Sequence, residues 1–269
     1  MKNEIEIHHL GLSSRMNRRK LPYAVLAPKS ASLIEKSNVL YLLHGLFGSY
    51  ENWLNNTDLC FYLEKFNFLV VCITGENSWY VDSENGCDFF ESYFVEELIP
   101  EVENRFVGAE NKIKRSIAGI SMGGYGAFKF AFKYPQKFVF AAAMSGAFHA
   151  SRITDGYSEN DYEVVYPSIL EAFGEPNSET RKKNDLCKLI TDFPVEQISE
   201  LPFLYFDCGS EDSFLPVNLS VAELFAHKRI SHEYRQLPGG HDWFYWNSRI
   251  ENILIQAEKL FEHPSFQGV

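Results

Sequence analysis

The stretch that decides the fold is Gly-Ile-Ser-Met-Gly at residues 119–123. It follows an apolar pair, Ile117 and Ala118, and precedes a segment, 125–134, that can form a helix. A serine between glycines at such a strand-to-helix corner occupies a tight, strained turn, which lifts its hydroxyl clear of the sheet. The N–H groups of the following helix point at that hydroxyl and favour negative charge there. The stretch therefore predicts that Ser121 is a nucleophile.

A Gly-x-Ser-x-Gly turn between a strand and a helix is typical of the nucleophile elbow of the α/β-hydrolases. An ordinary glycine-rich turn is the alternative, so the rest of the chain has to decide between them. Apolar runs of strand length alternate with helical segments, which predicts a mostly parallel sheet with helices on both faces. We therefore expect one α/β-hydrolase domain over residues 1–269.

The segments that carry this pattern follow one another along the chain. The expected strands lie at residues 4–12, 21–28, 39–43, 68–74, 117–119, 138–144, 204–208 and 233–237. The expected helices lie at 51–66, 90–106 (disturbed by Pro100), 125–134, 217–228 and 243–261. Residues 148–200 break the alternation, because they are polar and offer only short helical pieces at 168–173 and 185–190. We interpret 148–200 as an insertion that forms a small lid.

The composition is that of an acidic globular protein. Hydrophobic residues make up 45% of the chain and charged residues 23%, and the formal net charge is −11. This balance provides no basic stripe for a nucleic acid, and the basic cluster at residues 15–20 is best interpreted as a solvated turn. No run approaches the length of a membrane span, and the N-terminal residues lack the apolar core of a signal peptide. Five scattered cysteines fit reduced thiols, so we expect a cytoplasmic protein without a membrane partner.

A serine hydroxyl needs a base to become nucleophilic, and the base needs a carboxylate to orient it. In the α/β-hydrolases these residues follow the serine in the order acid, then histidine, each on a loop after a strand. His241 lies in the Gly-rich loop after the strand at 233–237, and it is the best base among eight histidines. His149, just past another strand end, could contact a substrate, although a packing role is the simpler interpretation.

Several acids compete to orient the histidine. Asp212 lies in the loop after the strand at 204–208, where a carboxylate can reach an imidazole, and we choose it. Glu211 is the realistic rival. Asp207 lies inside the strand and would be too deep, and Asp242 is adjacent to the histidine, where side chains seldom meet well.

An oxyanion hole requires two backbone N–H donors. Met122, the residue after the nucleophile, should provide one of them. The second should come from the loop after the strand at 39–43, which reads His-Gly-Leu-Phe-Gly at 44–48. Leu46 is the donor that we expect there. A glycine-rich turn without function becomes improbable once both motifs occur at matching strand ends.

Five motifs, taken together, resemble the esterase D family over nearly the full chain. They are Leu-Leu-His-Gly-Leu-Phe-Gly at 42–48 with Trp53, Asn-Ser-Trp-Tyr at 77–80, Gly-Ile-Ser-Met-Gly-Gly at 119–124, Cys-Gly-Ser-Glu-Asp at 208–212 and Gly-His-Asp-Trp at 240–243. That family includes S-formylglutathione hydrolases, feruloyl and acetyl-xylan esterases, tributyrin-type esterases and mycolyltransferases. The resemblance implies a nucleophile, an orienting acid and a base at Ser121, Asp212 and His241, with oxyanion donors at Leu46 and Met122.

The resemblance favours the tributyrin or feruloyl branch. The loop at 44–48 departs from the Leu-Thr-Cys that is usual in S-formylglutathione hydrolases, and the chain shows no signal segment of the kind expected for a mycolyltransferase. We also expect four aromatic residues to line an acyl or aryl pocket, namely Phe47, Trp79, Tyr80 and Trp243.

The sequence therefore predicts a serine carboxylesterase that hydrolyses short acyl or aryl esters through an acyl-enzyme on Ser121. Its partner is a small-molecule ester, and the reaction requires no cofactor and no metal. A thioesterase of the S-formylglutathione hydrolase kind or an acyltransferase could use the same site, and a catalytically silent ligand-binding domain is an alternative of another class. Dimers occur in this fold, so a homodimer is a possible assembly.

Overall fold

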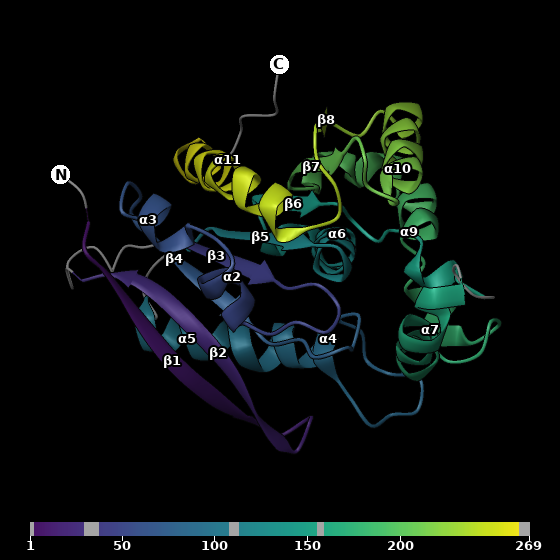
Figure 1. Ribbon diagram of the computed structural model, residues 1–269, viewed down its shortest axis with the longest axis horizontal. Coiled ribbons are helices and arrows are strands. Elements are labelled where there is room, and N and C mark those ends of the chain that lie inside the picture. Colours follow the sequence, from purple (N-terminus) through teal and green to yellow (C-terminus); the bar gives the residue numbers. More distant parts are fainter. Residues whose placement is uncertain (1–2, 30–37, 108–112, 155–158, 264–269) are drawn as a thin grey trace.

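The computed structural model describes residues 3–29, 38–107, 113–154 and 159–263, with only the backbone of 159–164. Within these residues one eight-stranded sheet runs through the molecule, in the order β1-β2-β4-β3-β5-β6-β7-β8 (Figure 1). Its strands are β1 (Ile5–Ser14), β2 (Arg19–Pro28), β3 (Asn38–Leu43), β4 (Phe68–Ile73), β5 (Arg115–Ile120), β6 (Phe140–Met144), β7 (Phe203–Gly209) and β8 (His232–Leu237). β1 and β2 pair antiparallel with their neighbours, and all pairs from β4 to β8 are parallel.

Helices cover both faces of this sheet. On one face lie α2 (Glu51–Asn55), α3 (Leu59–Leu63) and α11 (Trp243–Glu262). On the other lie α4 (Phe90–Ser92), the π-helix η1 (Tyr93–Leu98), α5 (Ile99–Phe106), α6 (Met122–Lys133), α9 (Leu186–Asp192) and α10 (Leu215–Lys228). The central strands are continuous apolar runs because successive side chains enter the two cores in turn; in β3, Tyr41 packs in one and Leu42 in the other. The predicted architecture, a mostly parallel sheet covered on both faces, is confirmed.

The predicted helix at 51–66 is wrong as a single element. It is divided into α2 and α3, because the polar residues between them bond locally and to α11. The Thr57 hydroxyl donates to the Trp53 carbonyl, and the Asp58 N–H donates to Asn247 Oδ1 at 2.8 Å. The Asn247 amide in turn donates to the Asp58 carboxylate at 2.9 Å. These contacts offer the backbone an alternative to the helix, and two of them depend on Asn247, a residue far away in the chain.

The expected disturbance at Pro100 takes the form of η1, which lies immediately before it. Proline has no N–H to donate to the carbonyl four residues earlier, so the regular α-helical ladder cannot pass through this point. The helix after Ser121 also begins earlier than predicted, at Met122 rather than at 125.

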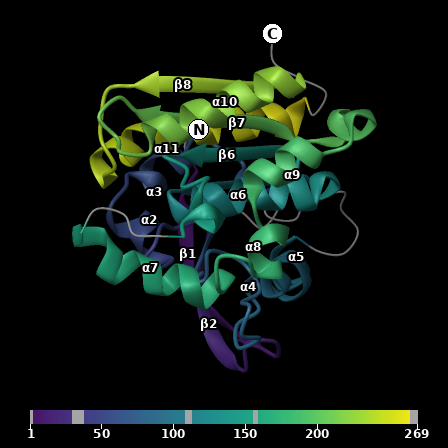
Figure 2. The ribbon, with the colours of Figure 1, turned by 90° about the vertical axis from the view of Figure 1, so that its right-hand side faces the viewer.

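The insertion contains more helix than the sequence predicts. Besides the turns η3 (Ala150–Arg152) and η4 (Val195–Glu200), it holds α7 (Glu159–Phe173) and α8 (Glu179–Lys183); the turn η2 (Pro135–Lys137) lies before it, between α6 and β6. α7 begins nine residues before the expected piece at 168–173. Figure 2 shows α7, α8 and α9 following one another along one side of the molecule. Among the described helices, none combines the length and apolar character needed to cross a bilayer.

Arg181 fastens this insertion from within. Its buried guanidinium donates from Nε to the Gly174 carbonyl at 2.8 Å and from one terminal nitrogen to the carbonyls of Ser151 and Ile153 at 3.0 and 2.6 Å. One side chain thus satisfies three backbone carbonyls of the insertion, of which that of Ser151 is buried and those of Gly174 and Ile153 are half-buried.

We expect Arg181→Met to lower the free energy of unfolding by about 3 kcal/mol, because it leaves one buried and two half-buried carbonyls without this donor. Chemical unfolding followed by tryptophan fluorescence measures the change. The matched control is Lys182→Met, which removes an exposed side chain paired only with Glu179 and should change stability by no more than about 0.5 kcal/mol. Equal losses in the two variants would contradict the anchoring role.

Candidate active site

Ser121 stands at the corner between β5 and α6 in a conformation that L-residues rarely adopt, with φ +52° and ψ −115°. The corner is tight enough to exclude any side chain at the flanking glycines. A Cβ at position 123 would lie 2.4 Å from the Leu43 carbonyl oxygen, and one at position 119 would lie 2.3 Å from the Gly123 carbonyl carbon. The two glycines therefore permit helix and strand to approach, and the strained serine is held out over the end of the sheet.

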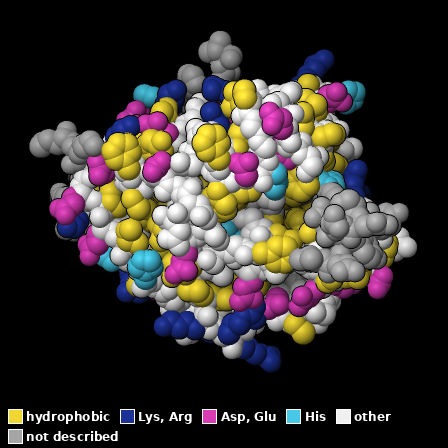
Figure 3. Space-filling model, viewed as in Figure 1, with side chains coloured by type: hydrophobic (Ala, Val, Ile, Leu, Met, Phe, Trp, Pro, Cys, Tyr) yellow, Lys and Arg dark blue, Asp and Glu magenta, His cyan; other side chains and the backbone are white. Residues whose placement is uncertain are grey.

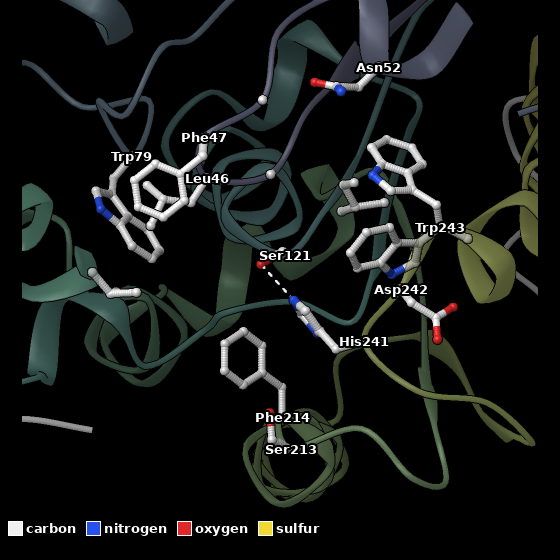
Figure 4. Close-up of a pocket in the computed structure, with 15 residues that line it drawn as sticks. Leu46, Phe47, Asn52, Trp79, Ser121, Ser213, Phe214, His241, Asp242 and Trp243 are labelled. Atoms are coloured by element: carbon white, nitrogen blue, oxygen red, sulfur yellow. Dashed lines mark hydrogen bonds between the residues drawn. The ribbon is translucent and has the colours of Figure 1, made fainter. Parts of the chain in front are cut away.

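Three loops bring a hydrogen-bonded Ser–His–Asp arrangement together at this edge, and Figure 4 shows its contact between Ser121 and His241. His241 Nε2 lies 3.0 Å from Ser121 Oγ, and His241 Nδ1 lies 3.1 and 3.0 Å from the two Asp212 carboxylate oxygens. The tautomer that satisfies every contact carries its proton on Nδ1, so that Nε2 is free to accept the serine proton. Edge contacts with Phe214 and Trp246, at 4.6 and 5.0 Å between ring centroids, hold the imidazole between them.

Asp212 is buried yet remains a carboxylate. Burial works against its ionisation, but the hydrogen bond from His241 and the N–H of Phe214, at 2.8 Å, outweigh it and hold the pKa of Asp212 below its usual range. Within the described residues its rivals do not reach the histidine. Glu211 is exposed, and Asp242 accepts the Tyr245 N–H at the start of α11.

Asp207 is engaged elsewhere, as its position inside β7 suggested. Its carboxylate accepts hydrogen bonds from the hydroxyls of Tyr205 and Tyr245, both at 2.8 Å, and lies 3.4 Å from Arg249 Nε. Burial raises the pKa of Asp207 despite these partners. The group ties β7 to α11 and does not face the serine.

The loop at 44–48 lies directly against the nucleophile. A Cβ on Gly45 would be 3.4 Å from Ser121 Cβ. Phe47 has φ +60°, and its N–H donates to Asn77 Oδ1 at 2.8 Å, which fixes the turn of the loop. In the described part of the chain, the N–H groups of Leu46 and Met122 have no protein acceptor. Leu46 thus lines the cavity beside the serine, and Met122 follows the serine directly in the chain.

His44, to which the sequence assigned no role, is buried next to this loop and supports it. Its buried ring accepts the Gly75 N–H on Nε2 at 2.8 Å, and its Nδ1 lies 2.6 Å from the Gly45 carbonyl oxygen. Burial lowers the pKa of His44 to about 4, so the ring is neutral and bridges two loops as one donor and one acceptor. Its position directly before the Gly-x-x-Gly turn was the only signal in the sequence.

A cavity of about 830 Å³ opens over Ser121 and His241, and Figure 3 shows apolar side chains around a hollow on this face. Three of the predicted pocket residues, Phe47, Trp79 and Trp243, line it. In Figure 4, Phe47 and Trp79 lie on one side of Ser121 and Trp243 lies on the other. The segment at 148–200 contributes Val165 to this lining.

The prediction that Tyr80 lines the pocket is wrong. Its side chain is buried beneath the loop at 44–48, and its hydroxyl donates to the His44 carbonyl at 3.1 Å. Two aromatic lining residues were missed, Phe214 and Trp246. Phe214 follows Asp212 by two residues, and Trp246 lies one helical turn after Trp243. Both could have been predicted from their proximity in the sequence to predicted site residues.

Comparison with known proteins gives this geometry a family. The Esterase family model matches residues 13–257. The chain belongs to the Esterase family. The acetyl esterase of Caldicellulosiruptor saccharolyticus is 33% identical to it over 229 residues, which cover 84% of this chain and 85% of that protein. The esterase described here is therefore a carboxylic ester hydrolase.

Solved structures show the same fold. The fluorophosphonate-binding serine hydrolase FphF of Staphylococcus aureus is 23% identical with a TM-score of 0.81, over 94% of this chain and 98% of that one. A ferulic acid esterase is 23% identical with a TM-score of 0.79, over 96% and 99%. The esterase thus has the α/β-hydrolase fold that its sequence predicted.

We expect Gly123→Ala to lower kcat about 100-fold or more and to lower the melting temperature, because the new methyl group must push the Leu43 and His44 carbonyls, and with them the loop at 44–48, away from Ser121. Steady-state kinetics of ester hydrolysis measure the loss. Gly86→Ala is the control: Gly86 has a positive φ, +67°, but open space around it, so the variant should cost about 1 kcal/mol of stability and leave kcat unchanged. A fully active Gly123→Ala enzyme would contradict the tight elbow.

Acid should destabilise the esterase through its buried histidines. Burial lowers the pKa of both His44 and His149 to about 4, whereas the unfolded residues titrate near pH 6.5. The stability that their neutral forms contribute is complete above about pH 6.5 and is lost as the pH falls toward 4. Each histidine adds about 1.4 kcal/mol per pH unit in that window. Unfolding of His149→Gln between about pH 5 and pH 6 should show a slope smaller by that amount, and an unchanged slope would contradict the assignment.

Proposed function

We propose that the esterase hydrolyses short acyl or aryl esters through a covalent acyl-enzyme on Ser121. The observation that carries the proposal is the pair of 3.0 Å contacts that link Ser121, His241 and Asp212 beside two unoccupied backbone donors. A binding protein has no need for a strained serine, a base, a buried carboxylate and an anion hole at one point, whereas acyl transfer uses all four.

In this mechanism Ser121 Oγ attacks the ester carbonyl while its proton passes to His241 Nε2. The carbonyl oxygen takes up the electron pair and is held by the N–H groups of Leu46 and Met122. When the tetrahedral intermediate collapses, the bond to the alcohol breaks and His241 gives its proton to the leaving oxygen. Water then attacks the acyl-enzyme with the same base, releasing the acid and restoring Ser121. Asp212 stabilises the imidazolium at both stages.

The cavity supports the choice of substrate class. Its volume suits a small organic molecule, and its walls at Phe47, Trp79, Phe214 and Trp243 offer aromatic faces, with few polar groups among them. An aryl group, whether in the acid or in the alcohol of the ester, would pack against such walls. A panel of acetyl, butyryl and octanoyl p-nitrophenyl esters, methyl ferulate, acetylated xylan and S-formylglutathione tests the class. A higher kcat/KM for the glutathione thioester than for every oxygen ester would replace this proposal by the thioesterase alternative.

Several broader expectations remain proposals of the same kind. We propose a single domain and a cytoplasmic location, which the five free cysteines support, because thiols stay reduced in that compartment. The homodimer stays a prediction.

We expect a fluorophosphonate to label the wild-type esterase rapidly and Ser121→Ala not at all. Asp212→Asn should reduce kcat about 10⁴-fold, because the amide holds the wrong histidine tautomer. Glu211→Gln is the matched control, since Glu211 neighbours Asp212 but is exposed, and it should retain wild-type kcat. Labelling at another residue, or an inactive Glu211→Gln beside an active Asp212→Asn, would overturn the assignment.

A further inference from the structure

Two consecutive residues beside the active site, Trp79 and Tyr80, have the left-handed backbone conformation, with φ +53° and +54°. Neither is glycine, so this segment stores strain that its surroundings must hold in place. Both side chains serve the site. Trp79 forms a wall of the cavity and donates from Nε1 to Ser168 Oγ on α7, at 3.1 Å, while the Tyr80 hydroxyl donates to the His44 carbonyl.

Lys129 holds this strained segment from the opposite side. It lies in α6, the helix that begins at the nucleophile, and its side chain is completely buried. Its ammonium group donates to the Tyr80 carbonyl and to Glu91 Oε2, the latter at 2.5 Å. Burying an ammonium group costs free energy unless the group is paired and hydrogen-bonded, so the burial of Lys129 in α6 needs a structural explanation.

The charges of this cluster are well defined. Burial lowers the pKa of Lys129 to about 8, although Glu91 acts in the other direction. Burial also opposes ionisation of Glu91, but the ammonium groups of Lys129 and Lys133 outweigh it and lower its pKa to about 2. At neutral pH the Glu91 carboxylate therefore lies between the ammonium groups of Lys129 and Lys133. Of these two groups, only that of Lys129 also donates a hydrogen bond to the Tyr80 carbonyl within the described residues.

From Tyr80 the contacts run to the loop that carries the anion donors. Its ring fills the space between two glycines; a Cβ would lie 2.2 Å from the ring at Gly75 and 2.7 Å at Gly126. The Gly75 N–H donates to the His44 ring, and the same ring contacts the Gly45 carbonyl. A shift of Tyr80 must therefore move Gly75, His44 or both, and these are the groups that shape the loop at 44–48.

We propose that Lys129 is a positioning residue for the oxyanion hole: by holding the Tyr80 carbonyl it keeps the loop at 44–48, and hence the Leu46 N–H, at the correct distance from Ser121. The inference rests on the proposed function, because it assigns the Leu46 N–H to the tetrahedral intermediate. It goes beyond that function by extending the catalytic apparatus to a buried ion pair on the far side of α6.

The chain supplies a matched control for this proposal. Lys133 lies one turn further along α6 and donates to the same Glu91 carboxylate, at 2.9 and 3.0 Å, and to Asn184 Oδ1 at 2.8 Å. No contact joins it to Tyr80 within the described residues. If the cluster served stability alone, Lys129 and Lys133 would act alike on kcat.

The test compares Lys129→Met, Lys133→Met and Tyr80→Phe, with kcat and KM for p-nitrophenyl acetate and Ki for a boronic acid that mimics the tetrahedral intermediate. We expect kcat to fall about 10- to 100-fold in Lys129→Met and Tyr80→Phe, Ki to rise by a similar factor, and KM to change little, since only transition-state contacts are lost. Lys133→Met should lower the melting temperature but keep wild-type kcat and Ki.

A folded Lys129→Met enzyme with wild-type kcat and Ki, or an equal loss in Lys133→Met, would overturn the proposal. If Lys129→Met does not fold, Tyr80→Phe, which deletes one hydroxyl, decides in the same way. Amide hydrogen exchange over residues 44–48 separates this inference from the proposed function. Faster exchange in Lys129→Met than in Lys133→Met supports positioning even if the wild-type protein hydrolyses no ester, whereas equal exchange overturns it.

Discussion

The contact between the first turn of α6 and the end of β3 is the constraint on which the site depends. Gly123 lies so close to the carbonyls of Leu43 and His44 that no side chain fits between them. The same approach forces Ser121 into its left-handed conformation and sets the following loop against it. The proposed nucleophile and the proposed anion donors are thus placed by one steric condition, since the loop that follows the Leu43 and His44 carbonyls also carries the Leu46 N–H.

Around this corner, burial and pairing decide the charge of each titratable group. His44 is buried without a carboxylate and stays neutral, so it can serve as both donor and acceptor. Asp212 is buried with His241 and stays ionised, so it can stabilise an imidazolium. Glu91 stays ionised because Lys129 and its neighbour in α6 face it. The protein thereby keeps opposite charge states within one core by giving each group a different set of partners.

Much of the fold and of the candidate site could be predicted because it depends on the order of residues within short segments of the chain. Apolar runs read as strands, since both faces of a parallel sheet are covered. That Ser121, Asp212 and His241 lie together could be predicted because each stands in a loop directly after such a run, and the carboxyl ends of parallel strands meet at one edge. The loop at 44–48 also follows a strand directly, and that strand, β3, lies next to β5 in the sheet. Loops that follow neighbouring strands therefore lie side by side at the site.

What the chain order could not reveal depends on contacts between segments distant in sequence. The break in the expected helix at 51–66 relies on Asn247 of α11, 189 residues beyond its partner Asp58. Tyr80 and Trp79 are neighbouring aromatic residues that both have positive φ, yet of the two only Trp79 lines the pocket. The Tyr80 ring packs against Gly126 of α6 instead, and its carbonyl accepts a hydrogen bond from Lys129. A side chain's direction at such points is decided by which cavity the folded core leaves for it, and only packing in three dimensions creates that cavity.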